Sequence, residues 1–257
     1  NMGTAQGLLA GMAGMYAVYH GPKGLNEIAS QIHYKTNALK EALSIFGYEM
    51  VEEPTFDTVK IKMGEEEKAS LKRLMKDHKI NLNYFTEGFV SVSINETTTL
   101  DRLQKLVDSF AHFKVKQSVK IIVKEENSIP NSLLRTDEIL KEEVFNKYHT
   151  ETELMRYIKR LERKDLSLTH SMISLGSCTM KLNAATEMLP LSWAEWGSVH
   201  PFVPVEQAGG YQTLIKELEK DLAEITGFAG TSLQPNSGAQ GEYAGLMVIR
   251  QYHKSRG

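Results

Sequence analysis

The spacing of apolar residues predicts two helices separated by a break at the start of the chain. Residues 2–19 combine large apolar side chains with Gly and Ala, a pattern typical of a helix that packs closely against its neighbours. The tripeptide His-Gly-Pro at 20–22 interrupts this pattern, because proline cannot continue a helix and is favoured in the first turn of the next one. Apolar residues then recur at helical spacing over 23–45, which predicts a long amphipathic helix.

The next stretch alternates between strand and helix periodicity. Val59, Ile61 and Met63 alternate with polar residues, which predicts a short strand. The following elements are predicted to be a helix at 65–78, strands at 82–85 and 89–94 joined by a tight turn, and a helix at 97–113 with Thr97 or Thr98 as its cap and Leu100 on its apolar face. This order predicts a small α+β layer with its helices on one face of the sheet.

A change of composition after residue 113 suggests the domain organisation. Residues 114–135 contain a β-like run at 119–123 and then Glu-Glu-Asn-Ser-Ile-Pro-Asn, which is typical of a linker. We therefore expect one domain over 1–113, a linker over 114–135, and a second domain over 136–257. Within the second domain, helices are predicted at 151–164, from 209 to Gly227, and from about 238 onward.

Composition excludes several classes of protein. The 257 residues suffice for one large or two modest domains, and the net charge of −2 argues against capture of nucleic acid or an acidic membrane surface. No apolar run reaches the roughly 18–20 residues of a membrane span. The single cysteine, Cys178, cannot form an internal disulfide, which suits a reducing compartment. The first residue is not methionine and a helical pattern is already under way there, so we expect an internal piece of a larger polypeptide.

The sequence LQPNSGAQGEYAGLM at 233–247 predicts a turn that leads into a helix N-terminus. Such an end has unpaired N–H groups and a partial positive charge, so it can hold a phosphate or carboxylate. Asn236 and Ser237 are candidate caps, and Gly238, Ala239 and Gly241 keep side chains away from an approaching anion. From these residues alone, a capped helix start without a ligand is the simpler interpretation.

Two further motifs carry candidate chemistry. In LGSCTMKLN at 175–183, the hydroxyls of Ser177 and Thr179 could hydrogen-bond a carboxylate, although a helix-capping turn is the simpler interpretation. Cys178 is either a reactive thiol or, as we favour, a small packed residue. His200 stands beside a proline and close to two tryptophans, so it is either a core histidine or a group that exchanges protons near neutral pH.

Together with VHPFVP at 199–204 and TAQGLLAGMAGMYAVYHGPKGL near the start, these motifs resemble the glycine dehydrogenase (decarboxylating) family, the P-proteins of the glycine cleavage system. The similarity also covers EVFNKYHTETELMRYIKRLERKDLSLTHSMI, and it is weaker over 35–123. It implies an α/β and α+β, fold-type I pyridoxal-phosphate enzyme of the single-chain type. The chain would comprise the small C-terminal α+β subdomain of the first half and the start of the second-half cofactor domain.

The resemblance also assigns roles to individual residues. Ser237, Gly238, Ala239 and Gln240 match the positions that hold the phosphate of pyridoxal 5'-phosphate. Ser177 and Thr179 match an active-site entry loop that contacts substrate, and His200 matches the wall of the channel for glycine and the lipoyl arm. Lys181 is not assigned as the Schiff-base lysine, because the family's lysine lies in a later glycine-rich region that no segment here matches. No metal site is expected.

The activity implied by the resemblance is decarboxylation of glycine through an aldimine with pyridoxal phosphate, followed by transfer of the aminomethyl group to the lipoyl arm of the H-protein. The resemblance implies a homodimer, located in the cytoplasm of a bacterium or the mitochondrial matrix of a eukaryote. Two alternatives remain: another fold-type I enzyme, such as a relative of serine hydroxymethyltransferase, and a non-catalytic scaffold half. Because the lysine is unmatched, we expect the chain by itself not to exchange the carboxyl group of glycine with bicarbonate.

Overall fold

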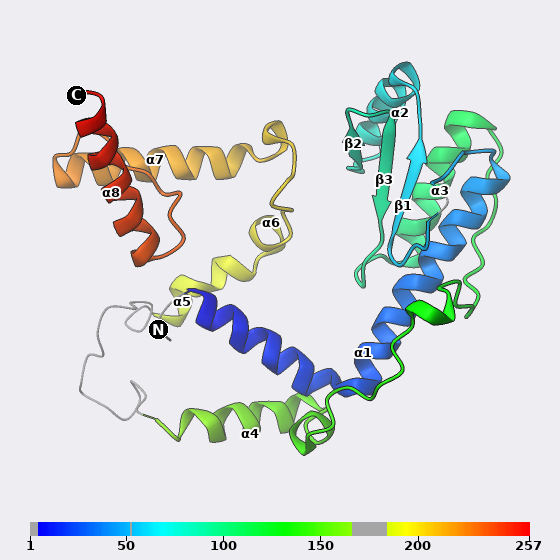
Figure 1. Ribbon diagram of the computed structural model, residues 1–257, viewed down its shortest axis with the longest axis horizontal. Helices are drawn as coiled ribbons and strands as arrows, with labels where there is room; N and C mark the ends of the chain where they lie inside the picture. The colour runs from blue at the N-terminus through cyan, green and yellow to red at the C-terminus, as the bar shows by residue number, and fades with distance from the viewer. Residues whose placement is uncertain (1–4, 52, 166–183) are drawn as a thin grey trace. The chain divides into compact units, whose positions relative to one another are not determined.

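The computed structural model describes residues 5–51, 53–165 and 184–257 (Figure 1). Residues 17–151 form one compact unit, and the described parts of 1–16 and 152–257 form a second. The first unit contains the predicted α+β layer. The second is built from helices, with no strand among its described residues.

The break predicted at 20–22 is confirmed as a kink inside the first helix, α1 (Ala5–Ile45). Gly21 adopts φ 61° and ψ −178°, which is not helical, and Pro22 follows it. The backbone oxygen of Tyr19 accepts a hydrogen bond from His149 Nδ1 at 2.8 Å. A Cβ atom on Gly21 would lie 2.6 Å from the backbone oxygen of Phe145 and 2.7 Å from His149 Cε1. Both the backbone conformation and the close approach therefore require glycine here.

The three predicted strands form one antiparallel sheet. The strands are β1 (Thr58–Lys62), β2 (Asn83–Phe85) and β3 (Phe89–Ser93), in the spatial order β1-β3-β2. Val59 pairs with Val92 and Ile61 with Val90, and all four side chains are buried. Lys60 lies on the opposite face of the sheet, with its ammonium group 4.2 Å from the centroid of the Phe89 ring. One face of the sheet is therefore apolar and buried, whereas the other carries Lys60, which is partly exposed.

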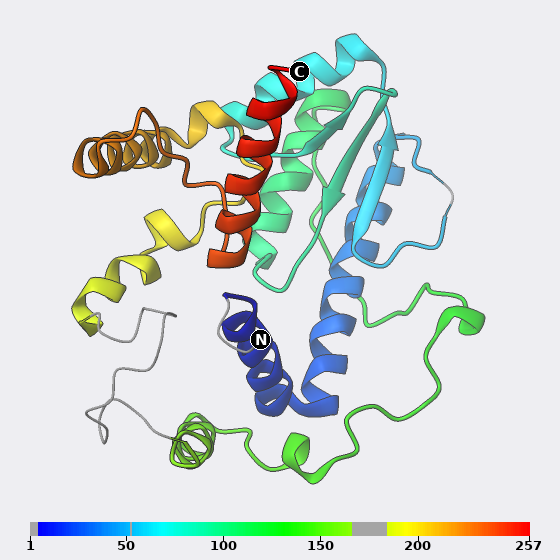
Figure 2. The same ribbon diagram turned by 60° about the vertical axis from the view of Figure 1, so that its left-hand side comes forward.

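Helices α1, α2 (Glu65–Asp77) and α3 (Leu100–Lys114) bury the apolar face of the sheet (Figures 1 and 2). The largest fully buried hydrophobic side chains are Phe110, Leu39, Leu43, Ile61, Leu71, Met75 and Leu103. The predicted layer of helices on one sheet face is thus confirmed. Its core is contributed by all three helices and by the strands.

The start of α3 differs from the prediction. Thr99 is the N-cap, and its hydroxyl accepts a hydrogen bond from the backbone N–H of Arg102. The hydroxyls of Thr97 and Thr98 instead donate to Asn95 Oδ1. The helix therefore begins later than expected, and its first residue, Leu100, is 57% exposed instead of lying on the buried face.

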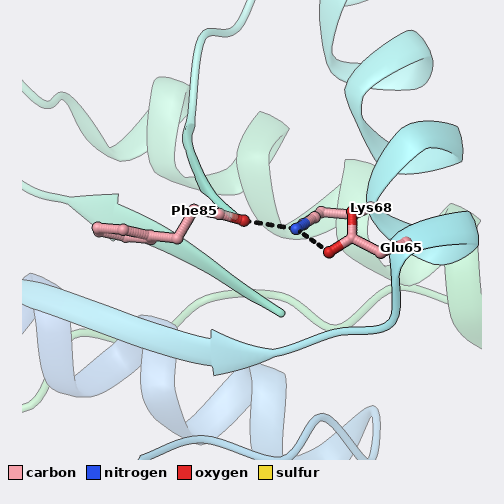
Figure 3. A network of polar contacts seen from close by, with 3 residues as sticks. All are labelled: Glu65, Lys68 and Phe85. Atoms are coloured by element: carbon pink, nitrogen blue, oxygen red, sulfur yellow. Dashed lines mark hydrogen bonds and ion pairs between the residues drawn. The ribbon is translucent and has the colours of Figure 1, made fainter. Parts of the chain in front are cut away.

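Lys68 is a buried lysine that joins α2 to the sheet (Figure 3). Its side chain is 8% exposed, and Nζ donates to Glu65 Oε1 at 2.6 Å and to the backbone oxygen of Phe85 at the end of β2. A buried charge is tolerated only when it is paired and hydrogen-bonded. This contact therefore fixes the β2 end of the hairpin to the helix.

Two tyrosines in the core differ in their hydrogen bonding. The hydroxyl of Tyr48 donates to the backbone oxygen of Phe110 at 3.1 Å, and the two rings meet edge to face at 5.3 Å. The hydroxyl of Tyr84 is buried and has no hydrogen-bond partner among the described residues. Burial raises the pKa of Tyr84 to about 12. The pKa of Tyr48 is also raised, mainly by burial and further by the carboxylate of Glu67.

The strand predicted at 119–123 is not formed. Val119 and Ile121 pack against the core, but the segment has no regular secondary structure. The side chain of Gln104 takes the place of a neighbouring strand, because its amide donates to Val119 O at 2.9 Å and its oxygen accepts from Ile121 N at 2.8 Å. Residues 114–135 as a linker between domains, and the boundaries on either side, stay predictions.

The described helices of the second unit match the predicted ranges closely. Its longer helices are α4 (Glu151–Glu162), α7 (Gly209–Thr226) and α8 (Gly238–Lys254), and α7 ends at Gly227 in the left-handed conformation. Short helical segments are η1 (Asn131–Leu133) and η2 (Glu143–Asn146) in the first unit, and α5 (Ala185–Met188), η4 (Leu189–Ser192), α6 (Ala194–Gly197) and η5 (Val205–Gln207) in the second. Among the described helices, none combines the length and hydropathy needed to cross a membrane. The assignment to fold-type I stays a prediction.

Candidate functional site

The candidate phosphate site lies at the N-terminus of α8. Ser237 is the N-cap, with extended backbone angles, and its hydroxyl oxygen accepts from the backbone N–H of Gln240 at 3.4 Å. The side-chain oxygen of Gln240 accepts in return from the backbone N–H of Asn236 at 2.9 Å. This exchange is a variant of the capping box, with the return bond one residue earlier than usual. It fixes the turn on which an anion would sit.

The first two amides of α8 are open. Among the described residues, no atom accepts a hydrogen bond from the backbone N–H of Gly238 or Ala239, and both residues are exposed. A Cβ atom on Gly238 would meet nothing within 4 Å. The partial positive charge of the helix end is concentrated on such unpaired amides. An anion could therefore approach the end of α8 directly.

The side chains of the capping box keep donors available for such an anion. Capping uses only the acceptor oxygens of Ser237 and Gln240. The hydroxyl hydrogen of Ser237 and the amide NH2 of Gln240 remain as donors. At the level of sequence, Gln240 is assigned only to phosphate binding, and Asn236 stands beside Ser237 as a candidate cap. The S-x-x-Q spacing is the sequence signal that would have revealed the return bond.

His200 is exposed among the described residues, and both of its interpretations, a core histidine and a proton-exchanging group, stay predictions. Its Nδ1 accepts a hydrogen bond from the backbone N–H of Phe202 at 3.0 Å, and the two rings lie 5.9 Å apart. Because Nδ1 is an acceptor, the neutral ring carries its proton on Nε2. Nearby, the hydroxyl of Tyr211 donates to the backbone oxygen of Trp196 at 2.7 Å, with the two rings edge to face. These contacts order the segment that carries His200.

The structure brings together only part of the predicted site. No hydrogen bond or ion pair among the described residues joins His200 to residues 237–240. Ser177, Thr179, Cys178 and Lys181 belong to 166–183, outside the described residues. Within the described ranges, no group of three or more His, Cys, Asp or Glu side chains is placed to hold a metal ion. The roles of all these residues stay predictions.

Comparison with known proteins shows which family and which proteins this chain resembles. Residues 1–110 match the family described as Glycine cleavage system P-protein. The whole chain is 58% identical to glycine dehydrogenase (decarboxylating) of Christiangramia forsetii, 54% identical to that of Flavobacterium johnsoniae and 52% identical to that of Nostoc punctiforme. In each case the chain spans 27% of the length of its relative. Residues 1–110 are thus similar to the glycine cleavage system P-protein family, and the whole chain is similar to about a quarter of each of these glycine dehydrogenases (decarboxylating).

Proposed function

We propose that this chain supplies the phosphate-binding part of a pyridoxal-phosphate site in a protein that decarboxylates glycine. The names of its relatives support this activity, and the open amides of Gly238 and Ala239 support the position of the phosphate. The amides are the observation that carries the proposal. An exposed helix end with two unpaired N–H groups fits a dianion.

The four residues at the start of α8 share the task of holding the phosphate. The N–H groups of Gly238 and Ala239 donate along the helix axis, and the Ser237 hydroxyl and the Gln240 amide donate from the side. Hydrogen bonds to an ionised group are roughly twice as strong as neutral ones. The helix dipole contributes a further ~0.3–1 kcal/mol to the binding of an anion at an exposed end.

The bound cofactor would supply an electron sink for the carbon that loses CO2. In this proposal His200 Nε2 carries the proton that is available in the substrate channel, because Nδ1 accepts a hydrogen bond from the backbone N–H of Phe202. Ser177 and Thr179 orient the carboxylate of glycine, and the lipoyl arm of the H-protein takes up the aminomethyl group. We further propose that the whole protein is a homodimer and, as the relatives named above come from bacteria, that it is located in the cytoplasm.

The test is a calorimetric titration with 4'-deoxypyridoxine 5'-phosphate, which carries the phosphate but lacks the aldehyde and so cannot react with surface lysines. The informative variants are Ser237→Asp and Gln240→Glu. Both keep an acceptor for the capping box but place a negative charge beside the phosphate. We expect each to weaken binding at least 10-fold relative to the unchanged chain.

The matched control is Gln212→Glu, which adds the same charge in the first turn of α7. It is expected to leave binding unchanged within about 2-fold. Equal affinity in all variants would place the phosphate elsewhere. No binding by the unchanged chain would contradict the proposal and favour the non-catalytic scaffold.

A further inference from the structure

Residues 117–129, here called the strap, follow α3 as an extended segment without regular secondary structure. None of its side chains is fully buried, although Val119 and Ile121 pack partly against the core. Ile122 is 67% exposed. A pocket of about 260 Å3 is lined by residues of α1 and by residues 122–128 of the strap. Apolar packing therefore contributes little to holding the strap in place.

Polar side chains from the folded core hold the strap at both of its ends. At the first end, Gln104 on α3 binds the backbone of Val119 and Ile121 through both atoms of its amide group. Asp108, one turn further along α3, accepts from the hydroxyl of Ser118. These bonds mimic the ladder of a sheet without a second strand.

At the second end, the strap is bound by His33 and Asn37 on α1. His33 is only 3% exposed, and its Nδ1 lies 3.0 Å from the backbone oxygen of Phe56. A carbonyl oxygen only accepts, so Nδ1 carries a proton. His33 Nε2 lies 3.1 Å from the backbone nitrogen of Ser128, which only donates, so Nε2 is the acceptor. The ring is therefore neutral, with its proton on Nδ1.

Asn37 completes this end of the attachment. Its amide NH2 donates to the backbone oxygen of Glu126 at 2.9 Å, and its oxygen accepts from the hydroxyl of Ser128 at 2.8 Å. The same NH2 group lies 3.1 Å from His33 Nε2. His33 is thus the one buried member of the polar cluster, and it contacts the loop at Phe56 as well as the strap.

We propose that the strap opens and closes as one segment on a core that stays folded, and that neutral His33, with its proton on Nδ1, holds it closed. Segments with few buried apolar contacts open locally at much lower free energy than the core around them. Releasing Ser128 from His33 breaks the attachment at the end of the strap that lies away from Val119 and Ile121, the residues that pack against the apolar cluster.

Native-state hydrogen exchange of the whole chain tests this proposal. In the unchanged protein, the amides of Ile121 and Ser128 are expected to exchange at least 10-fold faster than those of Val90 and Leu103 in the core. The variant His33→Phe keeps an aromatic ring stacked on Phe56 but removes the ring's hydrogen bonds to Phe56, Ser128 and Asn37. It is expected to lower protection of the strap amides a further 10-fold or more, with core protection unchanged.

The control is Lys124→Ala, which removes an exposed ion pair between the strap and Glu41. It is expected to change strap protection by less than about 3-fold. Loss of strap and core protection together in His33→Phe would overturn the proposal, as would an unchanged strap. Nitrogen-15 spectra of the unchanged protein give a separate check. A neutral His33 with its proton on Nε2 would also overturn the proposal.

Discussion

Replacing Gly21 by alanine would test whether the kink in α1 is built into the fold. Gly21 combines φ 61° with ψ −178°, a region that residues with a Cβ rarely adopt. The new Cβ would also lie 2.6 Å from the backbone oxygen of Phe145, closer than such contacts allow. Either the helix must change its path or the segment around residues 143–149 must move away.

The magnitude follows from these two effects. Holding alanine in this backbone region costs about 1–3 kcal/mol. Moving the 143–149 segment also loses the hydrogen bond from His149 to the backbone oxygen of Tyr19, whose net contribution is about 0.5–1.5 kcal/mol. We therefore expect Gly21→Ala to lower the free energy of unfolding by about 2–4 kcal/mol, a large part of the ~5–15 kcal/mol of a typical domain.

Urea unfolding followed by circular dichroism measures this loss, and two other glycines separate its causes. Gly47 has φ 75° but nothing within 4 Å of a Cβ, so Gly47→Ala is expected to cost only about 1–2 kcal/mol. Gly14 lies inside α1 without a positive φ and without neighbours, so Gly14→Ala is expected to be stabilising by about 0.5–1 kcal/mol. The three variants therefore separate the two causes: Gly21→Ala has both backbone strain and a steric clash, Gly47→Ala has backbone strain alone, and Gly14→Ala has neither.

Two results would refute this reasoning. A Gly21→Ala protein as stable as the Gly47→Ala protein would mean that the contact with Phe145 is easily relieved. A Gly21→Ala protein as stable as the Gly14→Ala protein would mean that the kink is not required at all, and that α1 can straighten without loss.

Further predictions concern buried polar groups, and all use urea unfolding. Tyr84→Phe is expected to be stabilising by roughly 1 kcal/mol because it removes a buried hydroxyl without a partner, whereas Tyr48→Phe breaks a hydrogen bond and is expected to be destabilising by a similar amount. Burial raises the pKa of Tyr84 to about 12, whereas the pKa of a tyrosine in the unfolded chain is about 10. The free energy of unfolding should therefore fall as the pH rises from about 10 to about 12, and it should fall less in Tyr84→Phe. Equal dependence of stability on pH in the two proteins would contradict this. Lys68→Met should lower the free energy of unfolding by about 1–3 kcal/mol, because it removes the hydrogen bond to the backbone of Phe85. Glu65→Gln should change the free energy of unfolding by under ~1 kcal/mol. Equal losses in the two variants would assign the effect to the ion pair between Lys68 and Glu65 instead.

The sequence by itself determined the elements whose signals are local. The periodicity of apolar residues located the longer helices of both units and the three strands to within a few residues, but not the short helical segments. The Gly-Pro pair marked the kink in α1, and Gly227 marked the end of α7, because φ restrictions act within one or two residues. The motif at 237–240 likewise placed a helix start, since capping joins residues three positions apart.

Only the tertiary structure decided which polar groups meet. Gln104 binds Ile121, which lies 17 positions away in the sequence, and His33 binds Ser128, which lies 95 positions away. No local sequence pattern could therefore predict either pair. The same reason explains why the β-like run at 119–123 is not a strand. A strand needs a neighbouring backbone, and here the side chain of Gln104 binds the run instead. Burial of individual residues, such as exposed His200 and buried His33, also depends on chain segments that fold against them from far along the sequence.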